Sequence, residues 1–384
     1  MFNGDRGINY PKDSDMVQAG IPFVNAGDLQ EGKVNLATAN KITREKFDQL
    51  GGAKIKRGDI LYCLRGTLGK NAFVDNFDEG TVASSLVDIR PKNVDSQYLF
   101  TVLNSDIEYR QRILCDEGAA QPNLSARNLA NFDIPVPKIE EQVKIGRYFE
   151  SLSNLIALHQ RKYDQLLNIK KSMLEKMFPK NGKKAPEIRF VGFTDDWEQR
   201  KLIEVCDYVD YRGKTPTKTK EGIFLVTAKN VKDGFIDYET SKEYISDDAY
   251  EEVMHRGKPE VGDVLITTEA PCGNVAQVNN ANIALAQRII KYRGHIGVVD
   301  NTYLKYYLLF PEFQKTLNAK SSGGTVQGIK GSVLHQQKIK YPSYEEQKKI
   351  GQHMNNLDNL ITLHQRKLEK LENLKKSMLK QMLL

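Results

Sequence analysis

The side chains able to carry out chemistry in this sequence form no catalytic pattern. The six histidines are scattered without metal-ligand spacing, and the four cysteines (Cys63, Cys115, Cys206 and Cys272) include no CxxC pair. The loop at residues 66–70 reads GTLGK and lacks the spacing of a phosphate-binding loop. Neither the Asp/Asn-Pro-Pro-aromatic loop of adenine methyltransferases nor the Pro-Asp and Glu-x-Lys pattern of nucleases occurs. The sequence therefore predicts a protein that is not an enzyme and holds no metal or cofactor itself.

A different set of side chains is suited to binding DNA. Arg, Lys, Asn and Gln read base edges, and Lys or Thr commonly contacts phosphate. The candidates lie in loops: Arg6, Asn9, Tyr10, Lys12, Arg65, Lys70, Gln121 and Asn123 in the first half, and Tyr211, Arg212, Lys214, Thr215, Lys218, Lys229, Asn274, Gln327 and Lys330 in the second. For any single one of them, a solvated surface side chain is the alternative interpretation.

Composition places these residues in an ordinary globular chain. The 384 residues are enough for two domains or more, with 40% hydrophobic and 27% charged residues. The net charge of +7 is compatible with a polyanionic partner. Widely spaced cysteines, a polar amino terminus and the lack of a long apolar run predict a soluble cytoplasmic protein.

The elements that must position the loops are organised around a repeat. Residues 140–178 read EEQVKIGRYFESLSNLIALHQRKYDQLLNIKKSMLEKMF, and residues 345–383 read EEQKKIGQHMNNLDNLITLHQRKLEKLENLKKSMLKQML. The two copies align without a gap at an offset of 205 residues, and more than half of the paired positions are identical. Such long internal similarity indicates that the chain is built from two related halves.

Each copy of the repeat has the pattern of a long helix. A seven-residue period marks a coiled-coil seam, formed by Ile145, Leu152, His159, Leu166 and Met173 in the first copy and by Ile350, Leu357, His364, Leu371 and Met378 in the second. At 1.5 Å per residue, each helix is expected to be roughly 55–60 Å long. A dimerisation coil is one interpretation, and antiparallel pairing of the two helices within one chain is the favoured one.

Landmarks before each helix also correspond. The Gly-Asp turns at residues 58–59 and 262–263 each precede a β-branched run, which predicts entry into a strand. The runs VDSQYL (residues 94–99) and VDNTYL (residues 299–304) each predict the start of a short helix. The fold class predicted is therefore α+β, with two mixed α/β domains and a pair of long antiparallel coiled-coil helices in a pseudo-two-fold repeat. The expected segments are a first domain (1–138), a first spacer helix (139–179), a linker (180–186), a second domain (187–343) and a second spacer helix (344–384).

The second domain has an opening that the first one lacks. Residues 190–202 carry Phe190, Phe193, Trp197 and Leu202, which are expected to cover the strands of the second domain. No counterpart precedes the first domain, so its start is expected to be incomplete and the domain to be less stable or completed by another chain.

Together these features resemble the specificity subunit of type I restriction–modification enzymes. The resemblance rests on the EEQxxIG helix start, the IPVP entry at residues 134–137, the Gly-Asp-Ile/Val-Leu strand entry and the FxxFxxxWxxxKL opening at residues 190–202. It implies a non-catalytic DNA-binding subunit whose two domains read the two halves of a split sequence in double-stranded DNA. It also implies two adenine-N6 methyltransferase subunits that use S-adenosylmethionine, and motor–nuclease subunits that use ATP and Mg.

Two other classes of protein compete with this interpretation. An interaction scaffold would use its helices to dimerise and its domains to bind protein or sugar. A self-sufficient methyltransferase would transfer methyl groups as a purified chain. Salt-sensitive binding to one split duplex sequence is expected only of the DNA-binding subunit.

The two histidines in the seam give one geometric prediction. His159 and His364 lie at the midpoints of the two repeat copies. If the helices pair antiparallel about a pseudo-two-fold axis, the two rings approach each other where the helices cross. Burial and mutual repulsion would then oppose protonation of both rings at once.

Overall fold

A computed structural model describes residues 1–115, 123–180, 182–213, 215–323 and 327–383. The chain forms two compact units, with unit 1 comprising residues 1–160 and 366–384, and unit 2 comprising residues 161–365. Each long helix thus contributes one part to each unit. This division differs from the expected segmentation, in which each helix is a separate spacer.

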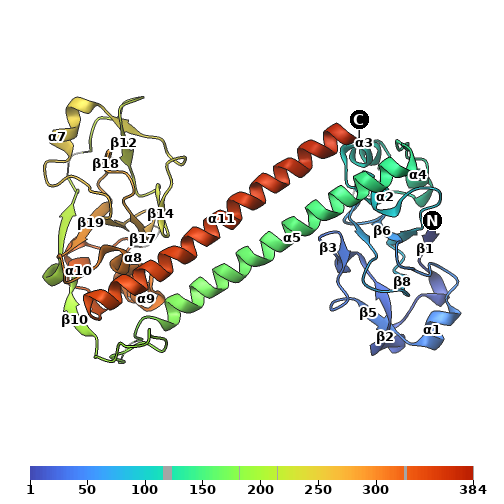
Figure 1. Ribbon diagram of the computed structural model, residues 1–384, viewed down its shortest axis with the longest axis horizontal. Coiled ribbons are helices and arrows are strands. Elements are labelled where there is room, and N and C mark those ends of the chain that lie inside the picture. Colours follow the sequence, from blue (N-terminus) through green and yellow to red (C-terminus); the bar gives the residue numbers. More distant parts are fainter. Residues whose placement is uncertain (116–122, 181, 214, 324–326, 384) are drawn as a thin grey trace. The chain divides into compact units, whose positions relative to one another are not determined.

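Unit 1 consists of short strands followed by helices (Figure 1). Its strands are β1 (Phe2–Asn3), β2 (Met16–Val24), β3 (Leu29–Gln30), β4 (Lys33–Val34), β5 (Asn40–Ile42), β6 (Ile60–Cys63), β7 (Asn71–Phe73), β8 (Thr81–Val82) and β9 (Leu86–Ile89). Its helices are α1 (Arg44–Gln49), α2 (Ser96–Val102), α3 (Asp106–Leu114), α4 (Ala126–Ala130) and the first part of α5 (Ile139–Lys176). The strands form one sheet in the order β1-β9-β6-β7-β4-β3 and a second in the order β5-β2-β8.

Unit 2 repeats this plan with additional elements. Its strands are β10 (Glu198–Lys201), β11 (Cys206–Asp210), β12 (Ile223–Val226), β13 (Val231–Lys232), β14 (Phe235–Ile236), β15 (Tyr244–Ile245), β16 (Val264–Thr268), β17 (Cys272–Gln277), β18 (Ile283–Leu285), β19 (Ile289–Gly294) and β20 (Lys338–Tyr341). Its helices are α6 (Leu202–Val205), α7 (Tyr250–Val253), α8 (Asn301–Leu309), α9 (Pro311–Lys320), α10 (Gly331–His335) and the first part of α11 (Tyr344–Met382). Two sheets, ordered β11-β19-β16-β17 and β15-β12-β18, are accompanied by the pairs β13-β14 and β10-β20.

Each domain is joined to a long helix by the same contacts. The Gln142 side chain of α5 accepts from the backbone N–H of Asp95 at 2.9 Å, and Gln347 of α11 accepts from that of Asp300 at the same distance. Each aspartate in turn caps its helix, α2 or α8. At Gly146 of α5, a Cβ would lie 2.9 Å from the backbone nitrogen of Tyr98. The EEQxxIG motif therefore provides an amide ligand and a glycine at which α2 approaches closely.

The predicted seam lies in the cores of both units. Ile145, Leu152, Ile350 and Leu357 are buried, and Leu166, Met173, Leu371 and Met378 are half-buried. In unit 1, the start of α5 packs with Met378 and Leu379 near the end of α11. In unit 2, the start of α11 packs with Leu166 and Met173 of α5. The antiparallel pairing of the helices is confirmed within each unit.

Polar contacts between the helices follow the repeat. In unit 1, Lys375 Nζ donates to Ser153 Oγ at 2.9 Å, and in unit 2, Lys170 Nζ lies 2.5 Å from Asp358 Oδ1. These two contacts join counterpart positions, because 205 residues separate Ser153 from Asp358 and Lys170 from Lys375. His159 belongs to unit 1 and His364 to unit 2, so the predicted approach of their rings stays a prediction.

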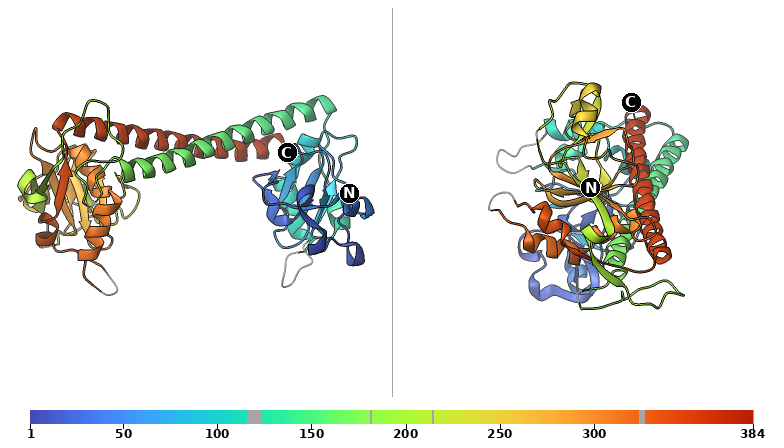
Figure 2. Two further views of the ribbon diagram at one scale, coloured as in Figure 1. Left: turned by 90° about the horizontal axis from the view of Figure 1, so that it is seen from below. Right: turned by 90° about the vertical axis from the view of Figure 1, so that its left-hand side faces the viewer.

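The opening of unit 2 forms a strand that unit 1 lacks among its described residues. β10 pairs antiparallel with β20 (Figure 2), and the segment corresponding to β20 in unit 1, residues 134–137, is not a strand. Tyr303 OH donates to the carbonyl of Lys340, as Tyr98 OH does to that of Pro135. The carbonyl at position 135 is therefore satisfied, whereas Val136 stays 56% exposed.

Candidate nucleic-acid interface

Two adjoining clefts on unit 2 contain many of the predicted binding residues. One, of about 390 Å³, is lined by polar groups that follow β16 and β18 and precede α10; these are Arg212, Thr268, Glu269, Gln287, Arg288, Ser322, Gly328, Ile329 and Lys330. The other, of about 250 Å³, extends past Thr215 to α7 and includes His255 and Arg256. Arg212 and Gln287 line both clefts, which places guanidinium, ammonium and amide donors on one continuous surface.

Arg212 is held in place by its neighbours at the end of β11. Its guanidinium lies 2.5 Å from Asp210 Oδ2, and this hydrogen bond raises the pKa of Arg212, which keeps the side chain charged. A Cβ on Gly331 would lie 2.4 Å from Arg212 Nη2, so glycine at the start of α10 is needed for this approach. The Arg256 guanidinium donates to the backbone carbonyl of Asp210 at 3.0 Å and supports the same turn.

Two further residues in the clefts escaped the sequence analysis. Gln287 donates to the carbonyl of Gly213 at 2.8 Å and to Thr215 Oγ1 at 2.5 Å, linking the end of β18 to the loop after β11. Arg288 is exposed and lies 3.4 Å from Glu269. The available signal was the polar AQR run directly after the apolar strand IAL, since binding residues often follow strand ends.

The remaining predicted residues of the second half have mixed positions. Tyr211 is buried and donates its hydroxyl to the Gly257 carbonyl at 2.6 Å, a position suited to supporting the loop. Asn274 donates to the Val231 carbonyl, and Lys218 pairs with Glu243 at 2.8 Å. Both Lys229 and Gln327 are exposed, whereas Lys214 lies outside the described residues.

In unit 1 the predicted residues fall into two groups. Arg6, Asn9 and Lys12 are exposed in one segment between β1 and β2, and the neighbouring Tyr10 packs edge-on against Phe23 at 5.6 Å. The second group consists of Arg65, joined by a backbone bridge to Asn123, and Lys70, which donates to the Ala26 carbonyl at 3.3 Å. Gln121 lies outside the described residues.

The two units present different charges at corresponding positions. The bridge between Arg65 and Asn123 in unit 1 matches the bridge between Glu269 and Gly328 in unit 2. A free-standing guanidinium side chain is thus exchanged for a carboxylate that is itself paired with Arg288. Because hydrogen-bond donors and acceptors distinguish bases, such a difference gives the two surfaces different preferences.

Nothing in the described ranges suggests catalysis or membrane insertion. Among these residues, no group of three His, Cys, Asp or Glu side chains could hold a metal ion. None of their helices is both long and apolar enough to cross a bilayer. Duplicated α/β domains with polar, donor-rich clefts define a class of non-catalytic recognition proteins.

Comparison with known proteins identifies the family within this class. Residues 2–168 and 194–373 both match the family described as type I restriction modification DNA specificity domain. The chain therefore belongs to the type I restriction–modification specificity family and carries the DNA specificity domain twice. Members of this family are DNA-recognition subunits without catalytic activity.

Relatives and solved structures agree with this assignment. The chain is 26% identical to the type I restriction enzyme MjaVIII specificity subunit of Methanocaldococcus jannaschii, across 98% of this chain and 94% of the relative. It is 22% identical to the putative MjaX specificity subunit of the same organism, across 97% and 88%. A crystal structure of the type I restriction–modification S subunit from M. genitalium matches with a TM-score of 0.55 and 14% identity, covering 100% of this chain and 94% of the other, which supports the fold.

Proposed function

We propose that this protein reads a bipartite DNA target in which each domain recognises one half-site. The observation that carries the proposal is the exchange of Arg65 for the Glu269–Arg288 pair at corresponding positions. Two similar domains with different loop chemistry suit two different half-sites. The paired helices keep a fixed gap between these half-sites, as dimer geometry sets operator spacing.

The bound subunit directs partner subunits to the target. The partners proposed are two adenine-N6 methyltransferase subunits that use S-adenosylmethionine and motor–nuclease subunits that use ATP and Mg. Family membership and the lack of a metal cluster among the described residues support this division of labour. The DNA-binding residues proposed in unit 2 are Arg212, Gln287, Arg288 and Lys330, which line one cleft.

Selection from a random duplex library tests the proposal. The purified subunit with its methyltransferase partner should enrich one sequence with two defined parts separated by a fixed number of unspecified bases. Binding should weaken steeply as salt rises, because contacts to phosphate release counterions. Enrichment of a single uninterrupted site, or of none, would favour the interaction-scaffold alternative.

A further inference from the structure

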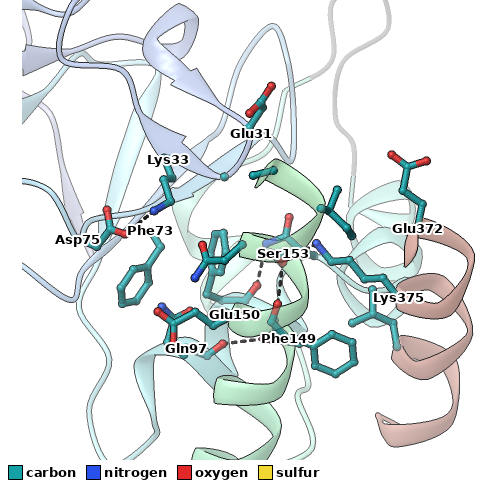
Figure 3. Close-up of a pocket in the computed structure, with 18 of the residues that line it drawn as sticks. Glu31, Lys33, Phe73, Asp75, Gln97, Phe149, Glu150, Ser153, Glu372 and Lys375 are labelled. Atoms are coloured by element: carbon teal, nitrogen blue, oxygen red, sulfur yellow. Dashed lines mark hydrogen bonds and ion pairs between the residues drawn. The ribbon is translucent and has the colours of Figure 1, made fainter. Parts of the chain in front are cut away.

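A cavity of about 470 Å³ lies in unit 1 where the β3–β4 turn, α2, α5 and α11 meet (Figure 3). Its wall is largely apolar, with contributions from Phe73, Phe100, Phe149, Ile156 and Leu379. Its size falls within the roughly 300–1,000 Å³ range of pockets that take small organic molecules. The DNA-binding residues proposed above do not line it, so the cavity is separate from that function.

One cation, Lys375, enters this cavity from α11. Its ammonium group donates to Ser153 Oγ at 2.9 Å, and burial lowers the pKa of this lysine. The carboxylates nearby are engaged or directed elsewhere: Asp75 pairs with Lys33 at 2.8 Å, and Glu372 points away from the ammonium group in Figure 3. The charge of Lys375 is therefore placed beside a hydroxyl group in a partly desolvated space.

The corresponding space in unit 2 is filled by the protein itself. There Asp358 pairs with Lys170 and also accepts a hydrogen bond from Tyr306 OH at 2.6 Å. By the 205-residue offset, Ser153 replaces Asp358 in unit 1 and Thr101 replaces Tyr306. Unit 1 thus lacks both the carboxylate that neutralises the lysine and the aromatic ring beside it.

We propose that the unit 1 cavity binds a small organic carboxylate with an aromatic or branched apolar group. The carboxylate of the ligand takes the place of Asp358 and pairs with Lys375. The apolar group takes the place of the Tyr306 ring and packs among Phe100, Phe149 and Leu379. Unit 2 provides the template, because it contains the same lysine with both groups supplied by the chain.

Phenylacetate is a suitable probe, with phenylacetamide as its uncharged match. Titrated into the full-length protein and followed by ligand-observed NMR, phenylacetate should bind with a Kd of about 1 mM or tighter, as expected for a compound of its size. Phenylacetamide should bind at least about tenfold more weakly, because it lacks the charge that pairs with Lys375.

Variants locate the site and separate it from DNA reading. Ser153→Asp copies the unit 2 pair and should abolish phenylacetate binding, and Lys375→Met should weaken it at least about tenfold. Lys376→Met, which removes an exposed neighbouring charge on the same helix, should leave it unchanged. DNA affinity of the Ser153→Asp protein should match that of the parent, which reports folding independently. Equal binding of acid and amide, or undiminished acid binding by a folded Ser153→Asp protein, would overturn the proposal.

Discussion

Asp88 in β9 is the residue at which the cores of the two units differ most in charge. It lies opposite Leu61 in the sheet of unit 1, as Lys291 lies opposite Leu265 in unit 2. Lys291 pairs with Asp263 at 3.3 Å, whereas Asp88 is fully buried and its carboxylate has no hydrogen-bond partner among the described residues. Burial, and then the nearby Asp59 carboxylate, raise the pKa of Asp88 well above its ordinary value.

Replacing this carboxyl group should therefore change how stability depends on pH. Folded Asp88 retains its proton where the unfolded chain has lost it, so unit 1 loses stability as pH rises above the ordinary carboxyl pKa. Asp88→Asn removes this loss and should stabilise unit 1 at pH 8, on the order of 1–3 kcal/mol, with a smaller effect at pH 5. Hydrogen exchange of β6 and β9 at the two pH values measures it. As a control, Asp59→Asn weakens the pair with Arg90 (2.7 Å) and should destabilise unit 1; a gain that is the same at both pH values would contradict the assignment.

Arg212 provides the residue-level test of the DNA surface. Arg212→Ala and Lys330→Ala each remove a cation from the cleft and should weaken specific binding by about 1–3 kcal/mol for a base contact. Lys242→Ala is the matched control, because Lys242 is exposed, pairs with Glu239 and does not line the cleft. Fluorescence anisotropy with the selected duplex measures all three variants. Equal losses in all three proteins would reduce the effect to net charge.

At the scale of elements, β10 distinguishes unit 2 from unit 1. The segment around β10 buries Trp197 and Leu202, and Arg189 makes a two-bond pair with the buried carboxylate of Glu346 at 2.8 Å. Glu141, the counterpart of Glu346 in unit 1, is exposed. Unit 2 therefore gains apolar burial and a charge-assisted pair that unit 1 lacks.

Unit 1 should consequently unfold at a lower denaturant concentration than unit 2. Trp197 is the single tryptophan in the sequence, so its fluorescence reports the unfolding of unit 2 alone. Burial of one aromatic ring and one leucine accounts for roughly 3–6 kcal/mol of the expected difference. Hydrogen exchange of residues 60–102 should show loss of protection before the fluorescence transition, and proteases should cleave residues 1–130 before 190–340. Coincident transitions would contradict this order.

The elements were largely predictable from the sequence, and the clefts only in part. Heptad spacing predicted both long helices within one or two residues, because a 39-residue repeat without internal proline has one regular solution. The Gly-Asp turns predicted the starts of β6 and β16. Gln287 and Arg288 were missed because strand pairing, which joins distant segments, brings them to the cleft. Tyr211 was expected in a loop surface, but its ring completes the core beneath it. The unit 1 cavity depends on side-chain volumes from three segments, so no local pattern signals it.

At the scale of the whole molecule, the long helices are proposed to set the gap between half-sites. Inserting one heptad after Leu167 keeps the seam pattern and lengthens the helix by roughly 10 Å, or about three base pairs of duplex. The insertion should therefore change the gap or abolish recognition, while the bases of each half-site stay the same. Methylome sequencing of cells that express the variant with its methyltransferase measures both. An unchanged target with an unchanged gap would exclude the helices as the spacer.

The central claim is that each domain reads its own half-site, and domain exchange tests it most directly. Residues 1–130 are replaced by the corresponding domain of a specificity subunit with a known target, and methylated adenines are mapped in cells that also express the methyltransferase. The account predicts that one half-site changes to that of the donor, while the other half-site and the gap persist. A change in both half-sites, or a target that does not change at all, would contradict it.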